Sequence, residues 1–256
     1  MNTAVLRQED IGFQANLYQS NNPVRRWLHN ARRNWVTQAI ESISPSLCTY
    51  LEVGIGCGIY TEQMAARGQV TAIDINASFV RSANRLSNVE ASVADIMTTS
   101  FPPLHDVAVC SEVIEHIPDS RAALRNIHAS LSHNGYLILS TPNSYSTMEV
   151  FARLLSFGPV VRLARLIYGE SVDDLGHINR LTRGQLSQQI EAAGFSVVRH
   201  TNIGLYVPVL AEFGGERGLR VSQWLADRFA RSPLLSHLLW TQCWLLRKGP
   251  AVTGDA

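Results

Sequence analysis

The stretch LEVGIGCGIYT, from Leu51 to Thr61, decides the fold. It begins as an apolar strand, passes through three alternating glycines, and ends where a helix is expected to start. Glycine adopts positive φ and carries no Cβ, so a ligand can lie directly against its main chain. The first amides of the following helix lack helical partners and can donate to that ligand. The sequence therefore predicts a binding loop between a strand and a helix.

The spacing of the glycines separates this loop from the dinucleotide fingerprint G-x-G-x-x-G. Counted from Gly54 and Gly56, the third glycine position is occupied by Ile59. The pattern present is acid-x-G-x-G-x-G, with Glu52 two residues ahead of the first glycine. At a switch point of a parallel sheet, such a loop is typical of a nucleotide-like ligand.

Two further acidic residues close the next two expected strands. Asp74 follows Gly54 by 20 residues, and a carboxylate there can accept hydrogen bonds from the hydroxyls of a ribose. The alternative is a local role for Asp74 as a helix N-cap or turn residue. Asp95, followed by Ile96, closes the third strand in a position that suits an exocyclic adenine amine.

Strand-like and helix-like segments alternate from Thr49 to Asn143, which indicates a parallel sheet covered on both faces. Helices are expected over Asn22–Ser44, over Ser120–Leu131 and, with a Thr-x-x-Gln capping box, over Thr182–Gly194. A further helix is expected to carry four residues on one face: Val221, Trp224, Leu225 and Phe229. The expected strands are Tyr50–Val53, Val70–Ile73, Ala91–Val93, Val107–Cys110, Tyr136–Ser140, Phe195–Thr201 and Gln242–Arg247.

Taken in order, these motifs resemble the class I S-adenosylmethionine-dependent methyltransferases over roughly Thr49–Thr201. The resemblance implies an α/β fold, a doubly wound, mostly parallel, seven-stranded Rossmann-like sheet with one antiparallel strand at its edge. It also implies that the glycines approach the methionine moiety, that Asp74 holds the ribose, and that Asp95 and Ile96 frame the adenine, with Ile75 on its face. The implied cosubstrate-binding residues are Glu52, Gly54, Gly56, Gly58, Asp74, Ile75, Asp95, Ile96 and Ser111.

The segment Ser111–Asp119, which follows the fourth strand, contains a candidate metal site. If it is helical, Glu112, Glu115 and His116 share one face. Carboxylates suit magnesium or manganese, and the imidazole shifts the preference towards manganese, iron or zinc. In the alternative, the two acids cap local backbone and His116 packs or acts as a lone catalytic base.

Two later segments strengthen the metal interpretation by resemblance. Ser140–Asn143 closes the next strand, and His177 lies just ahead of the capped helix. This arrangement resembles ubiquinone-pathway O-methyltransferases and small-RNA 2′-O-methyltransferases, in which a metal holds the acceptor oxygens. The implied ligands here are Glu112, Glu115, His116 and His177.

Charge and composition narrow the classes of partner. The chain has 22 Lys and Arg residues against 21 Asp and Glu, a net charge of +1 over 256 residues, so a nucleic-acid partner is not expected. The four cysteines form no CxxC pair and are expected to be reduced thiols. No signal peptide is predicted, and the longest apolar stretch, Leu234–Leu246, is too short and too interrupted to span a membrane. A cytoplasmic protein is expected.

The expected organisation is one methyltransferase domain over residues 1–256, with a cofactor-binding core at 49–143. Residues 22–44 are interpreted as a helical lid, and residues 144–176 and 205–240 as helical insertions that cover the acceptor site. The expected activity is O-methylation of a hydroxyl on an apolar or aromatic small molecule, with or without a divalent cation. The alternatives are a metal-independent N- or sugar-O-methyltransferase, or a non-catalytic protein that binds an adenosyl ligand or contacts a membrane peripherally.

Overall fold

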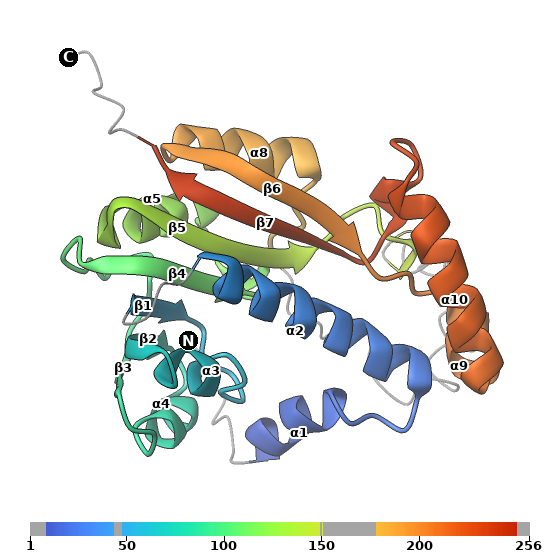
Figure 1. The fold of residues 1–256 in the computed structure, drawn as a ribbon, viewed down its shortest axis with the longest axis horizontal. Coiled ribbons are helices and arrows are strands. Elements are labelled where there is room, and N and C mark those ends of the chain that lie inside the picture. The colour runs from blue at the N-terminus through green and yellow to red at the C-terminus, as the bar shows by residue number, and fades with distance from the viewer. Residues whose placement is uncertain (1–8, 44–47, 149, 151–177, 250–256) are drawn as a thin grey trace.

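The computed structural model describes residues 9–43, 48–148, 150 and 178–249, and it contains a seven-stranded sheet (Figure 1). The strand order is β3-β2-β1-β4-β5-β7-β6. The strands are β1 Cys48–Val53, β2 Gly68–Asp74, β3 Val89–Val93, β4 His105–Ser111, β5 Leu131–Pro142, β6 Phe195–Ile203 and β7 Thr241–Lys248.

Strand β7 runs antiparallel to both of its neighbours, β5 and β6. The first five strands pair in parallel, so the expected seven-stranded, mostly parallel α/β sheet is confirmed. The expectation that the antiparallel strand lies at the edge is wrong, because β6 lies outside it. Strand β7 is almost wholly buried, as an apolar strand that pairs on both sides should be.

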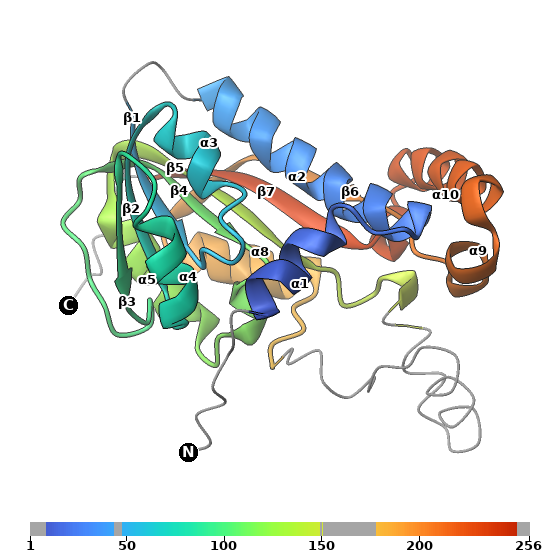
Figure 2. The same cartoon turned by 90° about the horizontal axis from the view of Figure 1, so that it is seen from below.

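Helices cover the sheet on both faces (Figure 2). Helices α2, α3 and α4 pack on one face, and α5 and α8 pack on the other. Helices α9 and α10 lie beyond the sheet, next to the first half of α2. The helices are α1 Glu9–Leu17, α2 Pro23–Ile43, α3 Thr61–Ala65, α4 Ala77–Ala83, α5 Ser120–Ser130, α8 Arg183–Ala192, α9 Pro208–Phe213 and α10 Gly215–Ala230, with 3-10 turns η1 Ile114–His116 and η2 Ser236–Leu238.

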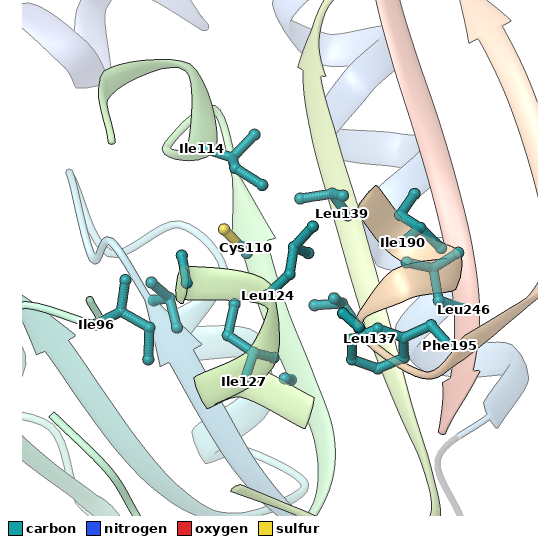
Figure 3. Close-up of a cluster of buried hydrophobic side chains, with 14 of the residues drawn as sticks. Ile96, Cys110, Ile114, Leu124, Ile127, Leu137, Leu139, Ile190, Phe195 and Leu246 are labelled. Carbon is teal, nitrogen blue, oxygen red and sulfur yellow. The ribbon is translucent and has the colours of Figure 1, made fainter. Parts of the chain in front are cut away.

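The core beneath α5 and α8 follows the periodicity of the sequence (Figure 3). Leu124 and Ile127 of α5 and Ile190 of α8 are fully buried against Leu137 and Leu246 of the sheet. The capping box is also present: the hydroxyl of Thr182 accepts from the amide of Gln185, whose side chain accepts from the amide of Thr182. These contacts hold the strand ends, and the loops that leave them, in fixed positions.

Helix α10 is present, and the expected face is partly confirmed, because Leu225 and Phe229 pack against the cluster of Leu205 and Leu239. Val221 and Trp224 are exposed, whereas small residues form the buried stripe: Gly218, Ser222 and Ala226. A Cβ at Gly218 would lie 2.1 Å from the carbonyl oxygen of Leu210, so α10 approaches α9 more closely than a larger residue allows. Close backbone packing against α9 therefore adds to the apolar packing of Leu219, Leu225 and Phe229 along this helix.

Ion pairs join α2 to the segment 205–240. Arg25 contacts Glu212 at 3.0 Å, and the hydroxyl of Tyr206 donates to the same carboxylate. Of the other proposed insertion, 144–176, only residues 144–148 and 150 are described. In the described part of the chain, no helix is both long enough and apolar enough to cross a membrane.

Candidate active site

The glycine loop lies where β1 ends and α3 begins, as the sequence predicts. Gly54, Gly56 and Gly58 have φ values of +82°, +53° and +78°, in the left-handed region that favours glycine. A Cβ at Gly54 would lie 2.2 Å from Cγ2 of Val113, so the absence of a side chain there is a steric requirement. The loop therefore presents bare main chain at the carboxyl ends of the central strands.

The carboxylate of Asp74, the last residue of β2, holds this loop. Its Oδ2 accepts from the amides of Ile55, at 2.9 Å, and Gly56, at 3.3 Å, while Oδ1 accepts from the amide of Asn76. Burial raises the pKa of Asp74, and four backbone amides, those of Asn76, Gly56, Ile55 and Ile75, partly offset that rise. These amides use most of the acceptor positions of the carboxylate, of which there are about four.

Glu52 lies beneath the loop and is buried. Its Oε2 accepts a 2.6 Å hydrogen bond from the hydroxyl of Thr61, and its Oε1 has no partner among the described residues. Burial is the main cause that raises the pKa of Glu52 to about 8, with a smaller contribution from Asp74. At neutral pH Glu52 is therefore largely protonated and can donate a hydrogen bond.

The remaining predicted cosubstrate residues have different surroundings. Asp95 accepts from the amide of Met97 in a turn, and Ile96 is buried in the core. Ile75 is 74% exposed beside the loop, so its side chain is available to a flat ring. Ser111 lies deeper in the site, with its hydroxyl 2.8 Å from that of Ser140.

Glu112 does not lie on a helix, so the predicted helical face is wrong. It has a left-handed φ of +56°, a conformation that is rare for non-glycine residues and costs about 1–3 kcal/mol. The 3-10 turn η1 begins only at Ile114. The turn places Glu115 in the interior and leaves the His116 side chain 46% exposed.

Glu115 is a fully buried acid close to His116. Its Oε2 accepts from the hydroxyl of Thr141, and its Oε1 lies 4.0 Å from Nε2 of His116. Burial, followed by the nearby carboxylate of Glu112, raises the pKa of Glu115 well above its ordinary value. The backbone carbonyl of Glu115 accepts from the amides of Ile178 and Asn179, which ties this turn to the segment ahead of α8.

Arg32 is the main site residue that sequence reasoning missed. It reaches from α2, is 7% exposed, and forms a 2.8 Å ion pair between Nη1 and Oε2 of Glu112. Burial disfavours its charge, but the carboxylate of Glu112 together with Tyr60 and Tyr18 more than compensates, and the pKa of Arg32 lies above its ordinary value. Its Nη2 lies 3.4 Å from Nδ1 of His29 and 3.5 Å from the hydroxyl of Tyr18.

Helix α1 also contributes to the site and was not expected from the sequence. A Cβ at Gly56 would lie 2.6 Å from Oε1 of Gln14, so the Gln14 side chain lies against the glycine loop. Tyr18, just after α1, has its ring 5.8 Å from that of His29. The amino-terminal helices therefore cover the loop and the carboxylate of Glu112.

The described residues do not fit the predicted divalent cation. They contain no group of three His, Cys, Asp or Glu side chains arranged to hold a metal, and His177 lies outside the described residues. Both oxygens of Glu112 are engaged, one by Arg32 and the other by the hydroxyl of Ser140. A dication beside this guanidinium would also be repelled.

Comparisons with known proteins agree with the fold. A ubiquinone biosynthesis O-methyltransferase of Pseudomonas paraeruginosa is 34% identical over 130 residues, which cover 47% of this chain and 54% of that protein. The chain thus spans about half the length of the curated relatives it matches.

Solved structures share the fold at low identity. The N-methyltransferase NodS of Bradyrhizobium japonicum, in complex with S-adenosyl-L-homocysteine, has a TM-score of 0.57 at 15% identity, covering 95% of this chain and 96% of its own. The cyclase SpnF has a TM-score of 0.55 at 17% identity, covering 85% and 80%. The family model for the methyltransferase domain matches residues 20–200. That match spans more than half of the chain, which therefore belongs to the methyltransferase-domain family and carries the class I S-adenosylmethionine-dependent fold that its motifs predict.

Proposed function

We propose that this chain transfers a methyl group from S-adenosylmethionine to a hydroxyl of an apolar or aromatic small molecule. The observation that carries the proposal is the glycine loop, whose amides at Ile55 and Gly56 are held by Asp74. The choice of oxygen as acceptor rests on the relatives, which are named as O-methyltransferases. The choice of a small, apolar acceptor rests on the near-neutral charge of the chain.

The residues around the loop fit the cosubstrate. S-adenosylmethionine, when bound, supplies an electrophilic methyl carbon on a sulfonium sulfur. The bare main chain at Gly54 and Gly56 leaves room for it, and the carboxylate of Asp74 lies beside the loop as the acceptor for a ribose hydroxyl. Glu52 offers an unpartnered oxygen beneath the loop, and the exposed Ile75 offers an apolar face to the adenine.

We propose His116 as the group that accepts the proton from the acceptor hydroxyl. Its ring is half exposed, so an acceptor can reach it, and Glu115 lies behind it with an oxygen 4.0 Å from Nε2. Burial, followed by the carboxylate of Glu112, raises the pKa of Glu115, and Glu115 holds the turn through its contact with the hydroxyl of Thr141. Positioning of the hydroxyl for in-line displacement supplies the rest, since well-oriented reactants gain up to about 7–11 kcal/mol.

The acceptor would lie between the amino-terminal helix at residues 22–44 and the segment 205–240. This assignment is supported by Trp240, which contacts both Arg32 and the cluster around Leu28. We further propose that residues 144–176 close the same pocket. An apolar acceptor suits these surroundings, since Trp27, Met148 and Leu219 pack in the same cluster.

Two measurements test the function. Isothermal calorimetry with S-adenosylhomocysteine tests the cosubstrate site, and an assay that follows labelled methyl groups into phenols, catechols, amines and sugars tests the acceptor. We expect binding and methyl transfer to a phenolic or catecholic oxygen. Transfer to nitrogen or to a sugar hydroxyl would contradict the acceptor class alone, and absence of binding by folded protein would contradict the whole proposal.

A second candidate function is contact with an anionic membrane surface through α9, α10 and the turn that follows them. Phe213 is 72% exposed, Trp224 57% and Leu234 84%, and Arg228 lies over the ring of Trp224 at 5.0 Å. The same segments carry exposed arginines, Arg217, Arg220, Arg228 and Arg231, along with two exposed acids, Glu216 and Asp227. Exposed apolar residues on a helix with an excess of cations are typical of helices that lie in a lipid interface.

Vesicle co-sedimentation tests this surface. We expect the chain to pellet with phosphatidylglycerol vesicles and not with phosphatidylcholine vesicles, and Trp224→Ser to weaken binding about tenfold. Val198→Ser, at an exposed valine on β6, is the matched control and should bind normally. Equal recovery with both lipids, or none with either, would contradict the proposal.

We propose that the protein is cytoplasmic, because free thiols such as that of the buried Cys110 persist in that compartment.

A further inference from the structure

We propose that Arg32 replaces a divalent cation in this site: its guanidinium is the permanent positive charge beside Glu112, and it excludes Mg²⁺ and Mn²⁺. The proposal rests on the proposed function, because it concerns the acceptor side of the same site. It makes methyl transfer by this chain metal-independent. It also makes Arg32 a positioning residue that acts through Glu112.

The first argument is the occupation of Glu112. Arg32 Nη1 lies 2.8 Å from Oε2, and the hydroxyl of Ser140 donates to Oε1. A charge-assisted hydrogen bond to a buried arginine is among the stronger polar contacts of a protein. A cation that used Glu112 as a ligand would have to break that bond and leave the guanidinium buried without its counter-charge.

The second argument is the rigidity of the pair. The backbone of Glu112 is fixed in the left-handed region, and its amide donates to the carbonyl of Ser140 at 2.9 Å. The ion pair is nearly enclosed, with side-chain exposures of 9% for Arg32 and 19% for Glu112.

The third argument is the cage around the guanidinium. Its carbon lies 5.4 Å from the ring centre of Trp240, and His29 and Tyr18 lie near Nη2. Burial and the charge of Arg32 lower the pKa of His29 to about 3, so that imidazole stays neutral. Trp240, Tyr18 and the neutral His29 thus contact the guanidinium in addition to Glu112, as expected for a cation with a structural role.

Arg33 provides a matched control on the same helix. It is the next residue along α2, carries the same charge, and stacks over the ring of Tyr18 at 5.9 Å. No ion pair joins it to Glu112 in the described part of the chain. Loss of Arg33 therefore removes one positive charge from α2 without freeing the carboxylate.

The test is a Mn²⁺ titration of the full chain, followed by electron paramagnetic resonance of the free ion. We expect no stoichiometric Mn²⁺ binding by the unaltered protein or by Arg33→Gln. Arg32→Gln should bind Mn²⁺ at least about tenfold more tightly than Arg33→Gln, because it frees the carboxylate of Glu112, whose charge acts on the nearby Glu115. Adding Glu115→Gln to that variant should abolish the gain.

Two outcomes overturn the inference. Stoichiometric Mn²⁺ binding by the unaltered chain, lost in Glu115→Gln, would show that the guanidinium does not exclude the ion. Absence of a gain in folded Arg32→Gln would show that Arg32 is not what excludes it. If Arg32→Gln does not fold, the same titration is made on Arg32→Lys, with Arg32→Lys plus Glu115→Gln for comparison. Lysine keeps the charge but lacks the bidentate geometry of arginine, so Arg32→Lys should bind Mn²⁺ more weakly than Arg32→Gln would and more tightly than the unaltered chain.

Activity and cosubstrate binding separate this inference from the proposed function. Methyl transfer should be unchanged after exhaustive treatment with EDTA, and recovery of lost activity by Mg²⁺ or Mn²⁺ would overturn the inference. Calorimetry with S-adenosylhomocysteine tests the function independently of metal. A chain that excludes Mn²⁺ yet binds no S-adenosylhomocysteine would contradict the function and leave the role of Arg32 standing.

Discussion

The carboxylate of Asp74 has two roles: it holds the glycine loop and, in the proposed function, it binds the ribose. It accepts from the amides of Ile55, Gly56 and Asn76, so its removal frees the glycine loop as well as deleting a ribose contact. We expect Asp74→Ala to weaken S-adenosylhomocysteine binding by about 10- to 100-fold, as for the loss of charged hydrogen bonds. Calorimetry measures the change.

Asp106 offers the control for that substitution. Its carboxylate also accepts from a backbone amide, that of Thr49, but near the opposite end of the strands. Asp106→Ala should therefore lose stability without losing affinity. Equal losses of affinity in both variants would mean that Asp74 acts through general stability, and the assignment of Asp74 to the ligand would be wrong.

Glu52 makes stability depend on pH. Its pKa is raised by burial to about 8 from an ordinary 4.5, so in the folded state it stays protonated after the unfolded chain has ionised. Its contribution is therefore fully present below about pH 4.5 and is lost as the pH rises through about 8. Relative to Glu52→Gln, which cannot ionise, the unaltered chain should lose about 1–4 kcal/mol between pH 5 and pH 8.

Urea unfolding at several pH values checks that difference. The Thr61 hydroxyl can still donate to the amide oxygen of Glu52→Gln, so the variant should retain the local hydrogen bond. A difference in unfolding free energy that stays constant over this pH range would contradict the prediction. A variant that titrates as steeply as the unaltered chain would place the pH dependence elsewhere.

At the residue scale, the sequence predicted what is local and missed what is distant. Asp74 lies at a strand end 20 residues from Gly54, a relation that the strand–helix alternation fixes. Arg32 meets Glu112 across 80 positions, and no local pattern pairs them. A signal was present nonetheless: Arg32 falls in step with Leu28 and Val36, on the buried stripe of α2.

At the scale of elements, periodicity predicted where helices occur more reliably than which face they bury. Leu124 and Ile127 pack as expected, because α5 covers a broad apolar sheet. On α10 the buried stripe is made of small residues, and Trp224 faces outward. A single helical face was predicted for Glu112, Glu115 and His116. Glu112 instead has a left-handed backbone, and the 3-10 turn that contains Glu115 begins only at Ile114, so Glu112 and Glu115 do not share a helical face.

The close contact of α10 with α9 gives a prediction for the pair of helices. Gly218→Ala should destabilise the protein by about 1–3 kcal/mol, because its Cβ would meet the carbonyl of Leu210 at 2.1 Å. Gly184→Ala, in α8, has nothing within 4 Å of its Cβ and should be neutral or stabilise by up to about 1 kcal/mol. Urea unfolding compares the two; a neutral Gly218→Ala would mean that the helices slide apart easily.

At the scale of the molecule, the alternation of strands and helices was enough to predict the sheet. The place of β7 between β5 and β6 was not derivable from the alternation, since an apolar strand can pair on either side of a neighbour. The same limit applies to α1, whose Gln14 lies against the glycine loop. A short helix without a clear apolar face carries no sign of the distant surface that it covers.

Because the glycine loop, α1 and the Arg32–Glu112 pair meet over one proposed cosubstrate site, a ligand there should stabilise the whole chain. At S-adenosylhomocysteine concentrations about 100 times the Kd, mass action adds about 2.7 kcal/mol. For a chain of this size that corresponds to a rise in Tm of about 5–10 °C. Differential scanning fluorimetry measures it, and the transition should remain single.

The substitutions at two aspartates make that rise specific. At the same ligand concentration Asp74→Ala should retain a rise of only about 1–5 °C, since its affinity falls 10- to 100-fold. Asp106→Ala should begin from a lower Tm and show the full rise, because its contact with Thr49 lies away from the loop. A full rise in Asp74→Ala would show that the ligand stabilises the protein from another surface, and the site would have to be sought away from Gly54 and Gly56.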